Sequence, residues 1–159
     1  RWLGDALHSL TRQSRPAAEI IYADDGSEDD SCSVAARLPC VRVLRLEHCG
    51  VAAARNAAYE ALRSAVNQVP YVLFFDGDDI ASEDLLRDGV AALDADLSAA
   101  VAYPRILIFE ESAAGHRVRP WINGQDYHAD RLPEQNVVPS PAVMRREAFE
   151  AAGRNVGRD

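Results

Sequence analysis

Residues 71–79, YVLFFDGDD, join an apolar run directly to a cluster of acids. The run Tyr71–Phe75 has the uniform apolar character of a central strand that is covered on both faces. Asp76, Asp78 and Asp79 follow at once. Ligands of parallel sheets bind beyond the carboxyl ends of the strands, so we expect a functional site where this strand ends.

Strand patterns alternate with helical patterns along the chain. The strand-like segments are residues 19–23, 41–46, 69–75, 101–109 (interrupted by Pro104) and 137–144. The helical segments are residues 1–14, 31–38, 51–65, 82–96 and 145–152. Residues 110–136 show weak periodicity and contain Gly and Pro, so we expect a long loop or lid there. The alternation predicts an α/β fold with a mostly parallel sheet flanked by helices.

The composition indicates one domain and argues against several classes of protein. With 159 residues the chain is long enough for one domain of ordinary size. Its formal net charge is −8 and it contains no lysine, which argues against a nucleic-acid partner. The longest apolar run is far shorter than the ~20 residues of a membrane span, so no span is expected. The cysteines lack a metal-binding spacing and are expected to be reduced thiols of a cytoplasmic protein.

Two acidic clusters at strand ends are candidate cation sites. Asp24 and Asp25 follow one strand-like segment, and Asp76 and Asp78 follow another. Carboxylates on such a turn can bind Mg²⁺ or Mn²⁺, which is usually held by one or two carboxylates together with phosphate oxygens. The alternative is a solvated turn that caps a helix.

A glycine turn at Gly50 precedes the alanine-rich helical segment of residues 51–65. Backbone N–H groups at the start of a helix can bind an anion, and Arg55 could reach a phosphate from there. The alternative is a tightly packed helix with Arg55 in a surface ion pair. The residues alone leave both interpretations open.

Four motifs occur in an order and spacing that match one enzyme family. Residues 19–31 contain a strand pattern that ends in D-D-G-S-x-D, and residues 49–56 contain G-x-x-x-A-R-N at a helix start. Residues 71–79 end in D-x-D-D, and residues 136–153 contain R-R-E-x-F-x-x-x-G. Together they resemble the family 2 glycosyltransferases, which have the GT-A (Rossmann-like) fold. The resemblance covers nearly the whole chain.

The resemblance implies a nucleotide-sugar site. The residues it assigns to that site are Asp24, Asp25, Arg55, Asp76 and Asp78. Asp24 and Asp25 would lie at the nucleotide base, and Arg55 would lie near the base or the diphosphate.

The resemblance also implies a metal cofactor, Mn²⁺ or Mg²⁺. Asp78 would bind the metal, and Asp76 would face the ribose or join the metal ligands. Asp79 and Gly50 would support the site.

The sequence departs from the family pattern at both ends. The family opens with an apolar strand that ends near P-x-Y-N, whereas this chain begins at the helix that follows. Its only methionine is Met144, so we expect residues 1–159 to be a single truncated GT-A domain from a longer protein. The family's catalytic base comes from a later acidic motif, which we expect beyond Asp159. This piece is therefore expected to hold much of the donor site and to lack full activity.

The implied reaction transfers a sugar from a nucleotide-diphosphate sugar to an acceptor hydroxyl, with metal dependence and inversion at the anomeric carbon. A hexosyltransferase of bacterial cell-wall or polysaccharide biosynthesis would fit, with a saccharide, lipid or protein acceptor. One alternative is a non-catalytic module that binds a nucleotide sugar. Another is a haloacid dehalogenase-like phosphatase with Asp76 as nucleophile. That family and receiver domains use a lysine in the site, and this chain has none.

Overall fold

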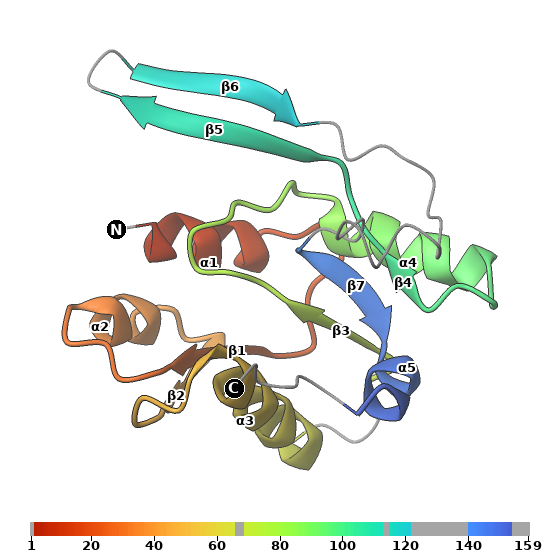
Figure 1. Ribbon diagram of the computed structural model, residues 1–159, viewed down its shortest axis with the longest axis horizontal. Coiled ribbons are helices and arrows are strands. Elements are labelled where there is room, and N and C mark those ends of the chain that lie inside the picture. Colours follow the sequence, from red (N-terminus) through yellow and green to blue (C-terminus); the bar gives the residue numbers. More distant parts are fainter. Residues whose placement is uncertain (1, 66–68, 113–114, 122–139, 154–159) are drawn as a thin grey trace.

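The computed structural model describes residues 2–65, 69–112, 115–121 and 140–153 (Figure 1). The helices are α1 (Leu3–Thr11), α2 (Ser31–Ala36), α3 (Val51–Ala65), α4 (Leu85–Ala95) and α5 (Arg146–Ala151). The strands are β1 (Ile20–Asp24), β2 (Val41–Arg45), β3 (Tyr71–Phe74), β4 (Val101–Ala102), β5 (Ile106–Ser112), β6 (Gly115–Trp121) and β7 (Ala142–Arg145). Each predicted helix is present, although α4 begins at Leu85 instead of Ser82. The α/β class is therefore confirmed.

The strands pair in three separate groups, and most of the pairings are antiparallel. β1 and β2 are parallel, with Ile20 opposite Val41. β7 lies between β3 and β4 and is antiparallel to both, and β5 and β6 form an antiparallel pair. The prediction of a mostly parallel sheet is therefore not confirmed among the described strands. The reason is β7, whose direction and position do not follow from its place in the sequence.

A β-hairpin occupies part of the segment that the sequence suggested was a loop. β5 and β6 pair residue by residue, from Ile106 opposite Trp121 to Ser112 opposite Gly115. The predicted loop over 110–136 is therefore wrong for 110–112 and 115–121, and residues 122–136 lie outside the described residues. Pro120 obscured the strand pattern, but proline is tolerated where a strand has an open edge.

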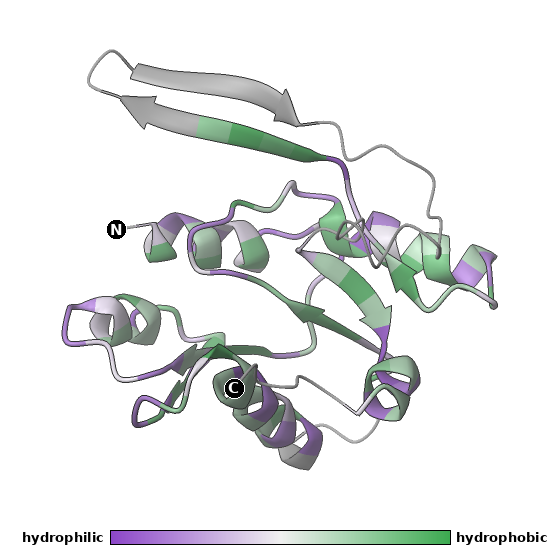
Figure 2. Cartoon of the chain, in the orientation of Figure 1, coloured by the Kyte–Doolittle hydropathy of each residue, from purple (hydrophilic) through white to green (hydrophobic). Residues whose placement is uncertain are grey.

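The core consists of clusters on different elements. Leu3 and Leu7 of α1 pack with Ala35 and Val41, which places one face of α1 against α2 and β2. Tyr59, Val72 and Phe149 join α3, β3 and α5. Val90, Leu93 and Val143 join α4 to β7. Figure 2 shows hydrophobic residues in β3 and β7 and hydrophilic residues recurring on α3 and α4. Each fully buried Leu or Phe stabilises the fold by about 1.5–3 kcal/mol.

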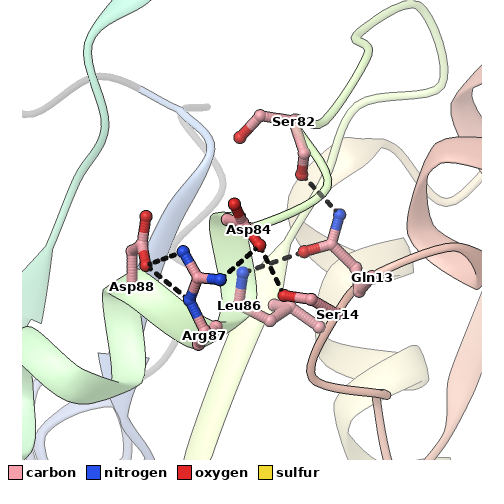
Figure 3. A network of polar contacts seen from close by, with 7 residues as sticks. All are labelled: Gln13, Ser14, Ser82, Asp84, Leu86, Arg87 and Asp88. Carbon is pink, nitrogen blue, oxygen red and sulfur yellow. Dashed lines mark hydrogen bonds and ion pairs between the residues drawn. The ribbon is translucent and has the colours of Figure 1, made fainter.

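Gln13 connects α1 to the start of α4. Its amide is buried; the Nε2 group donates to the carbonyls of Ser9 (3.1 Å) and Ser82 (2.6 Å), and Oε1 accepts from the Leu86 N–H (2.9 Å). Ser14 Oγ donates to Asp84 Oδ1 at 2.6 Å (Figure 3). These bonds hold the segment after β3 against α1, and this segment carries the acids that follow Phe75.

The contact between Gly89 and Val143 gives a test of the packing. A Cβ atom on Gly89 would lie 2.6 Å from Val143 Cγ2, and Val143 is buried. Gly→Ala within a helix usually stabilises by about 1 kcal/mol, but overpacking costs about 1–3 kcal/mol. We therefore expect Gly89→Ala to lower the free energy of unfolding, measured by urea denaturation.

Gly4→Ala is the matched control for this test. Its added Cβ would lie 3.7 Å from Val34 Cγ1, which is ordinary contact. We expect Gly4→Ala to leave the free energy of unfolding unchanged or to raise it. Equal stabilisation by both substitutions would contradict the packing of α4 against β7.

Candidate functional site

The carboxyl ends of β1 and β3 lie at the same end of the molecule. Figure 1 shows the two strands running in the same direction. Asp25, which follows β1, and Asp76, which follows β3, line one cavity of about 500 Å³ together with Arg55 of α3 and Gly77. The structure therefore brings together three of the residues that the sequence assigned to the site.

Asp25 bonds to the backbone that leads into α3. Its Oδ1 atom accepts from the Cys49 N–H at 2.6 Å and its Oδ2 atom accepts from the Gly50 N–H at 2.8 Å. These backbone donors, Cys49 first, lower the pKa of the Asp25 carboxyl. Gly50 has a φ of 83°, which a residue with a side chain rarely adopts. The anion next to the start of α3 is thus the protein's own carboxylate.

Asp24, the last residue of β1, makes contacts different from those of its neighbour Asp25. Its carboxylate is buried, and Tyr22 Oη donates to Oδ1 at 3.1 Å. Burial opposes ionisation of Asp24, but hydrogen bonds from Ser27, Cys32 and Tyr22 outweigh it and lower the pKa. Asp24 therefore holds a charge inside the loop that follows β1. Its predicted contact with the nucleotide base stays a prediction.

Arg55 and Asp76 form an ion pair across the cavity's end. Arg55 Nη2 lies 2.5 Å from Asp76 Oδ1, and the guanidinium carbon lies 6.0 Å from the centre of the Phe74 ring. Both side chains are partly exposed, so the pair contributes little to stability. Its effect is to orient the guanidinium group, whose fork of N–H donors suits phosphate oxygens.

Asp76, Asp78 and Asp79 crowd negative charge into one turn. The Asp79 N–H donates to the Asp76 carbonyl at 3.2 Å, which closes the turn. Burial, followed by the nearby charges of Asp76 and Asp78, raises the pKa of Asp79. A cation or a cationic ligand at this turn would relieve that repulsion.

The donor set suits a two-carboxylate metal site. In the part of the chain that the structure describes, no group of three or more His, Cys, Asp or Glu side chains is placed to hold a metal ion. Mg²⁺ needs only one or two carboxylates when phosphate oxygens complete its ligands. Asp76 and Asp78 provide these, although Arg55 already engages one oxygen of Asp76. Ligation by these two residues stays a prediction.

Several contacts that shape the site could not be predicted from any pattern in the sequence. The His48 ring lies against Gly26, where an added Cβ would be 2.7 Å from the nearest ring atom. Gln13 and Ser14 hold residues near Ser82 and Asp84, about seventy positions further along the chain. The D-D-G-S motif marked Gly26 as a turn residue, but motif spacing contains no information about these partners.

The sequence matches one protein family over almost its whole length. Residues 1–153 match the family described as glycosyl transferase family 2. Because the match covers almost the whole chain, the chain belongs to this family. Membership implies the GT-A fold, a nucleotide-sugar donor and an acceptor, and the family's enzymes commonly use divalent metals. No curated protein sequence matches the chain.

Among the helices of the described ranges, none combines the length and the apolar character that crossing a bilayer requires.

Asp25 gives a pH-dependent test of the site's architecture. Its folded-state pKa lies below the ordinary 3.8, so its bonds stabilise the fold above pH 3.8 and are lost as pH falls through the lower folded pKa. We therefore expect Asp25→Asn to be destabilising at about pH 7 and nearly neutral under strong acid. Urea denaturation across this pH range measures the difference.

Glu28→Gln removes one negative charge from the same loop and controls for net charge. A stability difference between wild type and Asp25→Asn that does not shrink on acidification would contradict the assigned hydrogen bonds.

Proposed function

We propose that this chain forms the donor-binding part of a metal-dependent, inverting glycosyltransferase. The observation that carries the proposal is the meeting of Asp25, Arg55 and Asp76 at one end of a cavity, next to Asp78 and Asp79. A nucleotide-diphosphate sugar has a base, a ribose and a diphosphate, which need polar groups, carboxylates and compensating positive charge. These residue types are present at that end of the cavity.

The contacts of Asp25 and Arg55 support the roles that we assign to them. Asp25 can accept further hydrogen bonds, because a carboxylate has about four lone-pair sites and the backbone uses two. The chain has no lysine, so arginine must supply the side-chain cation, and Arg55 lies beside the turn of acids. We assign Arg55 to the diphosphate and Asp25 to the base.

The exposed carboxylate of Asp78, with Asp76, would hold Mn²⁺ or Mg²⁺. The ion would neutralise the charge that develops on the diphosphate leaving group. Asp79 adds a third carboxylate to this turn, and burial, followed by the nearby charges of Asp76 and Asp78, raises its pKa.

The acceptor hydroxyl must lose its proton during the reaction. Inversion needs a base that takes the proton of the acceptor hydroxyl while that oxygen attacks the anomeric carbon. The acids described above are assigned to the donor, so none of them is assigned as this base. We propose a hexose donor and a saccharide, lipid or protein acceptor. We also propose a cytoplasmic location for the protein.

Nucleotide titration tests the donor site. We expect UDP, GDP or dTDP to bind in the presence of Mn²⁺ and to bind much more weakly without it, measured by calorimetry. Asp78→Ala should weaken that binding at least tenfold, about 1.4 kcal/mol, because it removes a metal ligand. Asp88→Ala is the control, since Asp88 is an exposed acid on α4 that pairs with Arg87.

Binding that is indifferent to both Mn²⁺ and Asp78→Ala would exclude the metal-dependent site. Metal-dependent binding without sugar transfer by the full-length protein would favour the non-catalytic module. Circular dichroism of each variant confirms that the fold is retained.

Arg55 distinguishes contact with the diphosphate from contact with the base. We expect Arg55→Gln to weaken binding of the nucleoside diphosphate about tenfold or more and to leave binding of the nucleoside unchanged. Calorimetry with UDP and uridine, or with the matching pair for the preferred base, measures both. Equal losses for the two ligands would place Arg55 at the base instead.

Arg63→Gln is the matched control on the same helix. Arg63 is exposed and pairs with Glu60 at 3.1 Å, so its loss should affect neither ligand.

A further inference from the structure

Residues 76–84, which we call the acidic segment, lead from the end of β3 to the start of α4 without helix or strand structure. Five of these nine residues are acidic and none is basic. Like charges so close together repel one another. The acidic segment therefore needs contacts with other elements to keep one conformation.

The C-terminal end of α1 provides such contacts to the backbone of the acidic segment. The Ala81 N–H donates to Ser9 Oγ at 3.0 Å, and the Ser82 carbonyl accepts from Gln13 Nε2 at 2.6 Å. The paired residues are 72 and 69 positions apart in the chain. The backbone is thus fixed only three residues after Asp78.

The side-chain amide of Gln13 also connects the ends of two helices. The last carbonyls and the first N–H groups of a helix have no partner within that helix. Gln13 Nε2 donates to the Ser9 carbonyl in the last turn of α1 (3.1 Å), and Oε1 accepts from the Leu86 N–H in the first turn of α4 (2.9 Å; Figure 3). Asp84 is the N-cap residue of α4, and within the described residues its side chain makes no capping bond. Gln13 therefore supplies this cap.

The burial of Gln13 makes its hydrogen bonds important for the position of the acidic segment. Gln13 is only 6 % exposed. Without its amide, the Ser82 carbonyl and the Leu86 N–H would lose this partner, and a buried polar group left unpaired costs its full desolvation penalty. Movement of the segment toward water would relieve that cost. Repulsion among its carboxylates favours the same movement.

We propose that Gln13 is a positioning residue for the metal site. By holding the acidic segment and the start of α4 against α1, it keeps Asp78 in the turn with Asp76, so that both carboxylates can reach one Mn²⁺ or Mg²⁺ ion. This inference rests on the proposed function, in which these two residues hold the ion. Residues that orient metal ligands commonly change metal affinity by about 10–100-fold.

The variant Gln13→Met keeps the length of the side chain and removes its hydrogen bonds. We expect it to reduce at least tenfold the factor by which Mn²⁺ strengthens nucleotide binding, and to leave binding without Mn²⁺ unchanged. Calorimetry on the full-length protein with UDP, GDP and dTDP, each with and without Mn²⁺, measures both quantities. A merely structural defect would weaken binding with and without the metal alike.

Thr11→Val is the matched control at the same end of α1. Thr11 Oγ1 donates to the His8 carbonyl of its own helix at 3.0 Å. We expect this variant to keep the wild-type dependence on Mn²⁺.

A double variant shows whether Gln13 acts through Asp78. Losses at independent sites add, whereas losses at coupled sites do not. If Gln13 positions Asp78, the double variant Gln13→Met, Asp78→Ala should lose no more Mn²⁺-dependent binding than Asp78→Ala alone.

Hydrogen exchange provides a measurement that requires no metal. The Asp79 N–H donates to the Asp76 carbonyl and closes the turn. We expect this amide to exchange at least tenfold faster in Gln13→Met, measured by mass spectrometry with fragmentation to single amides.

Ser9→Ala serves as a second variant if Gln13→Met fails to fold. It removes the hydroxyl that accepts from the Ala81 N–H, and alanine is favourable within a helix. The same reduction in the dependence on Mn²⁺ is expected.

The outcomes separate this inference from the proposed function. Wild-type dependence on Mn²⁺ in Gln13→Met would overturn the inference alone. Additive losses in the double variant, or unchanged exchange of the Asp79 amide, would overturn it as well. Nucleotide binding that is indifferent to Mn²⁺ in the wild-type protein would reject the proposed function, and this inference with it.

Discussion

The site depends on the bond between the Asp25 carboxylate and the backbone before α3. Its two oxygens accept from Cys49 and Gly50 at 2.6 and 2.8 Å. This contact ties the end of β1 to the beginning of α3, and one turn later α3 presents Arg55. Arg55 in turn meets Asp76, which follows β3. One carboxylate therefore aligns the ends of strands that belong to two different sheets.

The candidate site is built mostly from acidic residues, in a chain that is itself acidic. The net charge is −8, and Arg55 supplies positive charge beside Asp76 in the turn of acids. Asp24 is stabilised by hydrogen bonds, whereas burial and then the charges of Asp76 and Asp78 raise the pKa of Asp79. Negative charge is therefore concentrated in the turn after β3. The bonds of Gln13 keep it in place despite the repulsion.

In the described part of the chain, the buried apolar residues form several small clusters. One cluster surrounds α1 and β2, another lies between α3, β3 and α5, and a third joins α4 to β7. A cavity of about 500 Å³ lies among these clusters and is lined by residues of α1, β1, α3 and β3.

The sequence by itself determined the helices, most of the strands, the acids at strand ends and the family. Each of these rests on a local pattern: hydrophobic periodicity, an apolar run, or a motif such as residues 24–29. The tertiary structure alone decided that β7 lies between β3 and β4, that β5 and β6 form an antiparallel pair, and that Asp24 and Asp25 have different surroundings. It also decided that Asp25 binds Gly50 and that Gln13 binds Ser82. The physical reason is that these contacts join residues far apart in the chain, and their partners depend on how the elements pack, which no local pattern encodes.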